Sequence, residues 1–433
     1  MMTIARARLA LLGPACALAL VLPSPAASPE QGDGTSIRDI ESTNFDADFS
    51  PGESTVNAEA ELAEIYADNE NYLELAGGTS PLDLLANPMA ELYRKTGLRL
   101  GVANTMLFAQ PFGGQSDLSG FGGDLDFISS WTLIGRGTEN TGRFVFTGEY
   151  RYRVSDQTPS LLRGQMGTLI PPINTFNERG WVIRDCYWIQ RLWEGRIRIL
   201  VGRGDISDYV GSHWMQNVNN SFANRSFSAN PAMAFPGHGP MAGISLRPTD
   251  YFYLTAGAIN GYSDTTEVGL DTLFDEWDLF SVAEAGWTPT IKGLGPGRYA
   301  LAAWHMAARD LWDLPEDYGV TFIADQNLGG GWQVFARYAW SDAALTDIRN
   351  LGQAGVGLNG LLGREDDLTG LAFSVADPAS NDVRYETVAE VFHRFQLTRH
   401  TQFSVGLQLI ANPVNAPDNE TAGLFYARVR TSF

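Results

Sequence analysis

The last ten residues of the chain alternate between two kinds of side chain. One series is Phe425, Ala427, Val429, Thr431 and Phe433, and the other is Leu424, Tyr426, Arg428, Arg430 and Ser432. Successive side chains of a β-strand point to opposite faces, so this segment presents one largely apolar face and one face with two arginines. A strand with one face for lipid and one for water is typical of a transmembrane β-barrel.

The same two-residue period recurs through most of the chain and predicts about sixteen strands, an even number as in bacterial single-chain barrels. We expect them at 98–110, 121–135, 142–154, 181–193, 196–203, 241–247, 250–259, 278–288, 297–308, 317–326, 331–341, 351–361, 366–376, 382–398, 401–411 and 423–433. Short connections alternate with long ones, as in barrels with tight turns at one end and loops at the other. The predicted fold class is therefore all-β: a transmembrane antiparallel barrel with a short N-terminal helical segment.

The pleat of these strands assigns charged side chains to the inner face. Glu149 and Arg151 lie opposite an aromatic series in 142–154, and Arg337 lies opposite Trp332, Val334 and Tyr338. In 382–398 the inner series contains Glu386, Glu390 and Arg394. A basic side chain facing lipid at the bilayer midplane costs about 2–4 kcal/mol, which favours this assignment.

The chain before the first strand has a different composition. Residues 1–27 have two arginines, an apolar core and small residues, the pattern of a secretory signal. Residues 28–85 form an acidic arm with a helical pattern at 56–75, and we expect the arm to lie in the periplasm. A second helical pattern, 87–96, comes before the first strand. Residues 86–433 then form the barrel. No later segment has the roughly 20 apolar residues of a membrane-spanning helix.

Charge and candidate chemistry narrow the possible functions. The formal net charge is −20, and the segment 30–83 contributes −13 of it, from fourteen acidic residues and one arginine. A strongly acidic chain argues against nucleic-acid binding.

The five histidines lack a metal-binding spacing, so we expect no enzyme activity, no metal and no cofactor. Cys186 is the only cysteine after the signal segment, which excludes an internal disulfide.

The longest connection, 204–240, is rich in aromatic and asparagine residues, including Trp214. A loop of this length is usually functional or disordered. If it folds into the barrel it narrows the lumen, and its rings and amides suit sugars, whose C–H faces pack on aromatic rings. The alternative is a loop that only covers the barrel mouth.

Several segments resemble the carbohydrate-selective porins of the OprB family. They are Leu92 to Leu100, Val201 to Asp205, Pro231 to Gly239, Phe335 to Asp342, Gly355 to Asp367, Tyr385 to Thr398 and Gln408 to Pro413. They occur in order over about 86–433, whereas residues 28–80 are outside the resemblance. The resemblance implies a sixteen-stranded barrel, passive sugar uptake and an arginine-rich constriction.

The resemblance also supplies candidate lumen residues by position. They are Arg203, Asp205, Arg337, Glu386, Glu390 and Arg394, while Glu149 and Arg151 rest on the face assignment and Trp214 on the loop composition. The competing interpretation of each charged pair is a salt bridge that only stiffens the barrel wall.

The predicted function is passive diffusion of carbohydrates across the bacterial outer membrane. Two alternatives remain: a general or anion-preferring porin, and a structural outer-membrane protein anchored through its acidic arm. The expected partners are permeating sugars, outer-membrane lipid and lipopolysaccharide. A cell-wall or periplasmic partner of the acidic arm is a further possibility.

Overall fold

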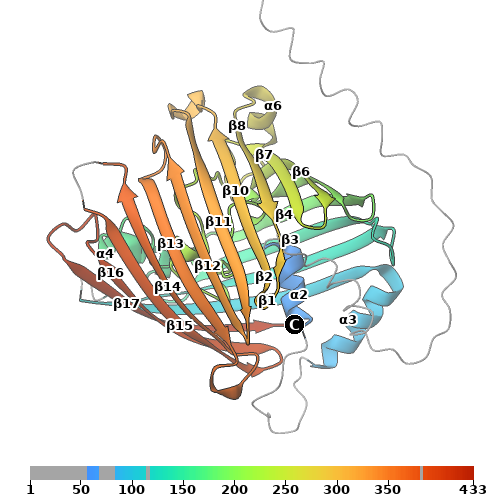
Figure 1. The fold of residues 1–433 in the computed structure, drawn as a ribbon, viewed down its shortest axis with the longest axis horizontal. Coiled ribbons are helices and arrows are strands. Elements are labelled where there is room, and N and C mark those ends of the chain that lie inside the picture. The colour runs from blue at the N-terminus through green and yellow to red at the C-terminus, as the bar shows by residue number, and fades with distance from the viewer. Residues whose placement is uncertain (1–55, 68–82, 114–117, 381–383) are drawn as a thin grey trace, which may run out of the picture. The chain divides into compact units, whose positions relative to one another are not determined.

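The computed structural model describes residues 56–67, 83–113, 118–380 and 384–433 (Figure 1). The predicted signal segment and most of the acidic arm therefore lie outside the described residues. The division of the chain into signal, arm and barrel stays a prediction.

The described residues form a closed antiparallel barrel. The strands are β1 (Leu98–Phe112), β2 (Gly120–Ile134), β3 (Gly142–Arg153), β4 (Gly180–Leu192), β5 (Ile197–Gly204), β6 (Gly239–Thr249), β7 (Phe252–Asn260), β8 (Leu279–Trp287), β9 (Thr290–Ile291), β10 (Gly295–Met306), β11 (Asp317–Gly329), β12 (Trp332–Ser341), β13 (Ile348–Asn359), β14 (Leu368–Pro378), β15 (Glu386–Thr398), β16 (Thr401–Ala411) and β17 (Thr421–Ser432). Neighbours in the chain pair with each other, and β1 pairs with both β2 and β17, which closes the sheet. Apart from the two-residue β9, sixteen strands form the wall. The predicted fold class is confirmed.

Burial along the strands follows the predicted pleat. In β17, Tyr426 and Arg428 are at most 1% exposed, whereas Phe425 and Val429 are about 40% exposed. The same alternation buries Glu149 and Arg337 and exposes Phe144 and Tyr338. Apolar side chains thus form the outer band of the barrel, and the inner face holds most of the charge, as a membrane barrel requires.

The connections differ at the two ends of the barrel. Turns such as 193–196, 250–251, 330–331 and 399–400 join strands at one end, which we call the short-turn end. Connections such as 154–179, 205–238 and 261–278 join strands at the other end. Strand β1 begins and β17 ends at the short-turn end, so the charged residues near these termini lie at that mouth.

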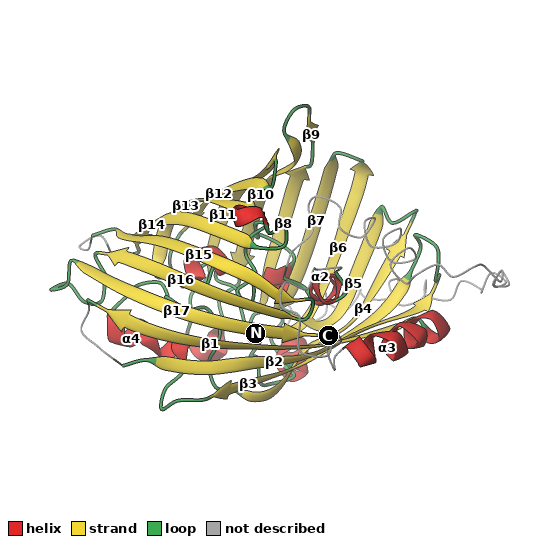
Figure 2. Cartoon of the chain, turned by 90° about the horizontal axis from the view of Figure 1, so that it is seen from below, coloured by secondary structure: helices red, strands yellow, loops and turns green. Residues whose placement is uncertain are grey.

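Five α-helices are found among the described residues: α2 (Ala58–Ile65), α3 (Asp83–Thr96), α4 (Leu162–Met166), α5 (Arg225–Ser228) and α6 (Leu270–Asp275). Asn57 caps α2 by accepting a hydrogen bond from the Ala60 backbone N–H at 2.9 Å. Within the described part of the chain, no helix combines the length and apolar character needed to cross a bilayer. Figure 2 shows α2 inside the ring of strands.

Candidate functional site: the barrel lumen

The loop 205–238 folds into the barrel and packs against the inner face of the strands across the lumen. Phe222 and Phe227 are fully buried, and Phe222 contacts Phe335 of β12 and Phe392 of β15. These side chains belong to one apolar cluster with wall residues of β1, β14, β16 and β17. The loop therefore lies inside the lumen and does not extend outward from the barrel mouth.

Carboxylates of the far wall hold the backbone of this loop. Glu390 accepts hydrogen bonds from the backbone N–H groups of Ala223 at 2.7 Å and Asn224 at 2.9 Å, and from the Tyr426 hydroxyl at 2.8 Å. Glu284 of β8 accepts from the Gly211 N–H at 2.8 Å. Because these acceptors are buried, they satisfy N–H groups that would otherwise be orphaned in the loop.

Arg337 is the second anchor of loop 205–238. Its guanidinium donates to the backbone carbonyls of Gly211 and Ser226, each at 2.9 Å, and to that of Ala229. It also donates to the side-chain oxygens of Gln216 and Gln353 at 2.8 Å. The arginine faces inward as predicted, but its donors are directed to the loop.

The connection 154–179 also enters the lumen. Glu386 accepts from the backbone N–H groups of Leu169 at 2.6 Å and Ile170 at 3.0 Å, and Gln408 donates to the Pro172 carbonyl at 2.9 Å. The sequence analysis did not single out this loop. A run of apolar and proline residues, Leu169 to Ile173, is the signal that could have marked it as buried.

Helix α2 is a third element inside the ring of strands (Figure 2). Its glutamates contact the inner face: Glu59 lies 2.7 Å from Arg143 of β3, and Glu61 lies 2.9 Å from Arg430 of β17. The sequence analysis placed the whole acidic arm in the periplasm, whereas the structure places this part of it in the lumen. The physical reason is charge, because the helix supplies carboxylates to wall arginines.

Between loop 205–238, β2, β3 and α2 there remains a polar cavity of about 200 Å³, which we call the polar cavity. Its ionisable lining residues are Glu61, Asp124, Asp126, Glu149, Asp205, Asp208, Arg151, Arg184, Arg225 and His238. Asn174, Asn217, Asn219 and Asn230 add amide groups. The lining thus offers both donors and acceptors, with six carboxylates and three arginines.

Glu149 and Arg151 meet in the polar cavity, as the face assignment predicted, and they form an ion pair. Asp124 and Asp126 of β2 join them, and carboxylate oxygens of Asp124, Asp126 and Glu149 all lie within 4.8 Å of one another. Arg184 pairs with Asp208 across the same space. The sequence analysis missed Asp124, Asp126 and Arg184, although the period-two spacing of the two aspartates was a visible signal.

Asp205 lies directly after β5 and also lines the polar cavity. Its carboxylate lies 3.3 Å from the His238 imidazole and accepts from the Ser207 N–H at 2.9 Å. Burial alone would raise the pKa of Asp205, but the contacts with His238, Arg184 and Ser207 outweigh burial and lower it. Asp205 therefore contributes a negative charge to the cavity.

The remaining candidates differ in their positions. Arg203 lies on the same face of β5 as the exposed Val201 and donates to five backbone carbonyls, those of Ile183, Asp264, Thr265, Glu267 and Val268. It is therefore not a lumen residue, contrary to the expectation from the resemblance. Arg394 faces the short-turn end and donates to the Asp366 carbonyl at 3.4 Å. Trp214 is half-buried in the loop, where its backbone N–H donates to Asp325 at 3.2 Å.

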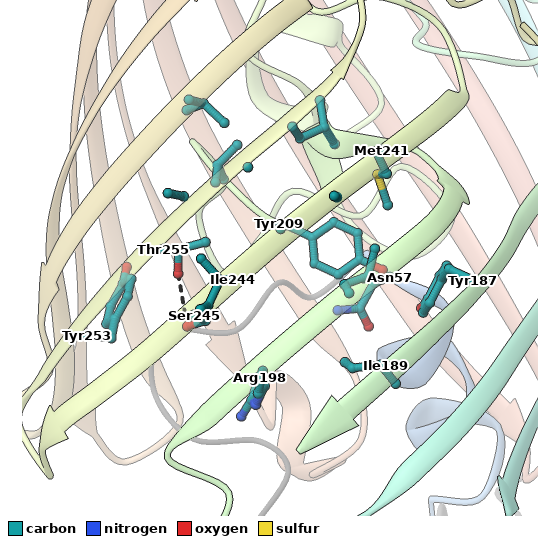
Figure 3. Close-up of a pocket in the computed structure, with 18 of the residues that line it drawn as sticks. Asn57, Tyr187, Ile189, Arg198, Tyr209, Met241, Ile244, Ser245, Tyr253 and Thr255 are labelled. Carbon is teal, nitrogen blue, oxygen red and sulfur yellow. Dashed lines mark hydrogen bonds between the residues drawn. The ribbon is translucent and has the colours of Figure 1, made fainter. Parts of the chain in front are cut away.

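A second, more apolar cavity of about 110 Å³ adjoins α2 on the side of β4 to β7 (Figure 3). Tyr187, Tyr209 and Tyr253 line it together with Asn57 and Met241. Figure 3 also shows the hydrogen bond between Thr255 and Ser245, 3.0 Å long, on its wall. We call this space the tyrosine cavity.

Comparison with known proteins supports the resemblance noted in the sequence. Residues 314–433 match the family described as carbohydrate-selective porin, OprB family. A structure of Pseudomonas putida OprB at high pH superposes with a TM-score of 0.67, covering 84% of this chain and 99% of that chain at 16% identity. A low-pH structure of the same protein gives a TM-score of 0.53, covering 85% of this chain and 100% of that chain, also at 16% identity. At such identity these likenesses establish the fold.

Porin AaxA of Chlamydia muridarum is 24% identical over 274 residues, which cover 62% of this chain. The matched region spans 59% of the length of that relative. Together with the closed barrel, these findings show that the chain has the β-barrel fold of porins, and the predicted resemblance to the OprB family is confirmed. A porin barrel points to a channel and not to an enzyme.

Proposed function

We propose that this protein is a passive diffusion channel for carbohydrates, and that the polar cavity is the place where a sugar is selected. The observation that carries the proposal is the way two loops fill the lumen and leave a small space lined by ion pairs and amides. A wide, water-filled pore would need neither loop. A narrow, hydrogen-bonding constriction is what a selective channel for uncharged solutes requires.

The chemistry of the lining supports a polyhydroxylated solute. Arg151 and Arg184 supply N–H donors, Glu149 and Asp208 supply acceptors, and Asn217 supplies both. A sugar hydroxyl also donates and accepts, so it can exchange its bonds to water for bonds to such a lining with little net cost. Because each paired charge is already compensated, binding stays weak and exchange fast, as passage through a channel requires.

The alternatives predict different linings. An anion-preferring porin needs an excess of basic groups, whereas the polar cavity has six carboxylates and three arginines. A purely structural barrel has no need for a cavity with this mixed lining. Of the expected arginine-rich constriction we retain two arginines, Arg151 and Arg184. Each of them forms an ion pair with a carboxylate.

Reconstitution of the full-length protein in planar bilayers tests the proposal. Addition of a monosaccharide should reduce the ion current in a concentration-dependent way, and Arg151→Gln should weaken this block. Arg153→Gln is the matched control, because Arg153 lies on the same strand but is exposed beside Glu178 at 3.4 Å. Ion conduction without block by any sugar would favour the general porin, and a complete lack of conduction would favour the structural protein.

A further inference from the structure

Helix α2 occupies the lumen at the short-turn end of the barrel. Its partners lie at the starts or ends of strands at that mouth: Arg143 in β3, Arg191 in β4, Gln402 in β16 and Arg430 in β17. They come from both sides of the seam where β1 meets β17. The helix thus bridges a wide arc of the mouth.

Each glutamate of α2 is matched by groups on the wall or on loop 205–238. Glu59 pairs with Arg143 and lies 3.9 Å from Arg191. Glu64 accepts hydrogen bonds from the side chains of Asn220 at 2.7 Å and Gln402 at 3.1 Å. With the pair between Glu61 and Arg430, three carboxylates hold one short helix in place. The contact through Asn220 joins the helix to the loop that enters from the opposite end.

An apolar face of the helix packs against the inner face of the first three strands. Ala58 and Leu62 are 1% exposed and belong to a cluster with Ala103, Ile128 and Val145 of the first three strands. Gly101 of β1 makes room for the helix: a Cβ there would lie 2.7 Å from Ile65 Cδ1 and 2.9 Å from Leu62 Cδ2. The wall is therefore shaped to receive this helix.

The helix also lies between the two cavities of the lumen. Val56 and Glu61 line the polar cavity, whereas Asn57 and Glu59 line the tyrosine cavity. The helix thus takes up space beside both cavities, at the mouth that its wall partners surround.

The helix is held by side chains, because it is not part of the sheet. An isolated helix of eight residues is unstable in water, so α2 keeps its form only while it is docked. We propose that α2 is a displaceable plug, which narrows the channel at the short-turn end and opens it when the helix leaves its site. The inference goes beyond sugar selection, since it concerns the passage of any solute, ions included.

Neutralising the helix tests the proposal. The triple variant Glu59→Gln, Glu61→Gln and Glu64→Gln keeps the size of the side chains and removes the charges that pair with the wall. In planar bilayers, without sugar, we expect a severalfold rise in single-channel conductance. The matched control is Glu91→Gln in α3, where Glu91 pairs with the exposed Lys95 on the same helix. It should conduct as the unchanged protein does.

A second variant leaves the helix sequence intact and changes its receptor. Gly101→Leu fills the space that Leu62 and Ile65 occupy, and it should raise the conductance in the same way. Gly352→Leu is its control, because a Cβ at Gly352 meets no atom within 4 Å. Heat-resistant electrophoretic mobility verifies that each barrel is folded. Folded triple and Gly101→Leu variants that both conduct as the unchanged protein would overturn the plug.

Because the readout is ion current without sugar, this test is independent of the proposed sugar selection. Loss of sugar block with an intact plug response would contradict only the proposed function.

Discussion

Arg430 and Glu61 lie 2.9 Å apart although 369 positions separate them in the chain. Arg430 is 2% exposed and Glu61 is 3% exposed, so the pair is buried. The same arginine donates to the Thr105 hydroxyl at 2.9 Å, and Thr105 is its register partner across the β1–β17 seam. One guanidinium therefore joins the lumen helix, the first strand and the last strand.

The plug should respond to acid. Burial alone would raise the pKa of Glu59 and Glu64, but the facing arginines outweigh burial and lower both values below the ordinary 4.5. A depressed pKa in the docked state means that docking gains stability above the undocked pKa and loses it as the pH falls through the docked value. The groups facing the two carboxylates are Arg99, Arg143, Arg191, Arg394, Arg430, Gln402 and Asn220.

The expected result is a flat conductance above pH 4.5 and a rise below it. The measurement is single-channel conductance as a function of pH at constant ionic strength. In the triple glutamine variant the rise should be absent, since the titrating groups have been removed. A conductance in the unchanged protein that falls steadily on acidification would contradict the prediction.

Arg337→Ala should loosen loop 205–238. The substitution removes the Arg337 donors from the buried carbonyls of Gly211 and Ala229, at a cost of about 1–3 kcal/mol for each buried group left unsatisfied. The Ser226 carbonyl still accepts from the Gln353 side-chain amide. We expect faster amide hydrogen exchange in the loop and a noisier open-channel current. Arg203→Ala is the control, because Arg203 also binds loop carbonyls but lies outside the lumen. The open-channel current of this variant should be no noisier than that of the unchanged protein.

Replacing Asp205 with asparagine should shift ion selectivity toward anions. Its carboxylate lines the polar cavity and carries a negative charge, and the substitution reduces the carboxylates of the cavity from six to five while its three arginines remain. The reversal potential in a salt gradient reports this shift directly. Asp250→Asn, at an exposed turn beside Arg196, should leave the reversal potential unchanged. An unchanged reversal potential in the Asp205 variant would mean that this aspartate is not on the ion path.

Trp214→Ala tests whether loop aromatics contribute to sugar binding. If the indole stacks on a passing sugar, its loss should weaken sugar block by roughly 1–3 kcal/mol, the scale of a lost buried apolar contact. Conductance should stay the same or rise slightly. Trp193→Ala, at a turn where the side chain is 62% exposed, is the matched control. Equal block in the unchanged protein and the Trp214 variant would place that indole away from the sugar.

The barrel itself was predictable because its signal is local. The two-residue period placed Arg337 and Glu390 on the inner face, and the structure confirms both positions. The same period would also have corrected Arg203, which shares the face of Val201 and was assigned to the lumen by position in the resemblance alone.

The function of the inward charges could not be predicted in the same way. An arginine that lines a pore and an arginine that anchors a loop both occupy inward-facing positions of a strand, so the two-residue period does not distinguish them. Only the fold of 205–238 shows that Arg337 anchors a loop. Helix α2 presents a similar case. Its apolar period indicates a buried face, but its receptor at Gly101 and Arg430 is assembled from strands at both ends of the chain.

The position of α2 couples the two ends of the chain during assembly. Closure of the β1–β17 seam brings Arg430 beside Thr105, and Glu61 of α2 supplies its carboxylate partner. That partner is present only once the helix has entered the lumen. The final strand pairing therefore gains this ion pair only in a barrel in which α2 is seated.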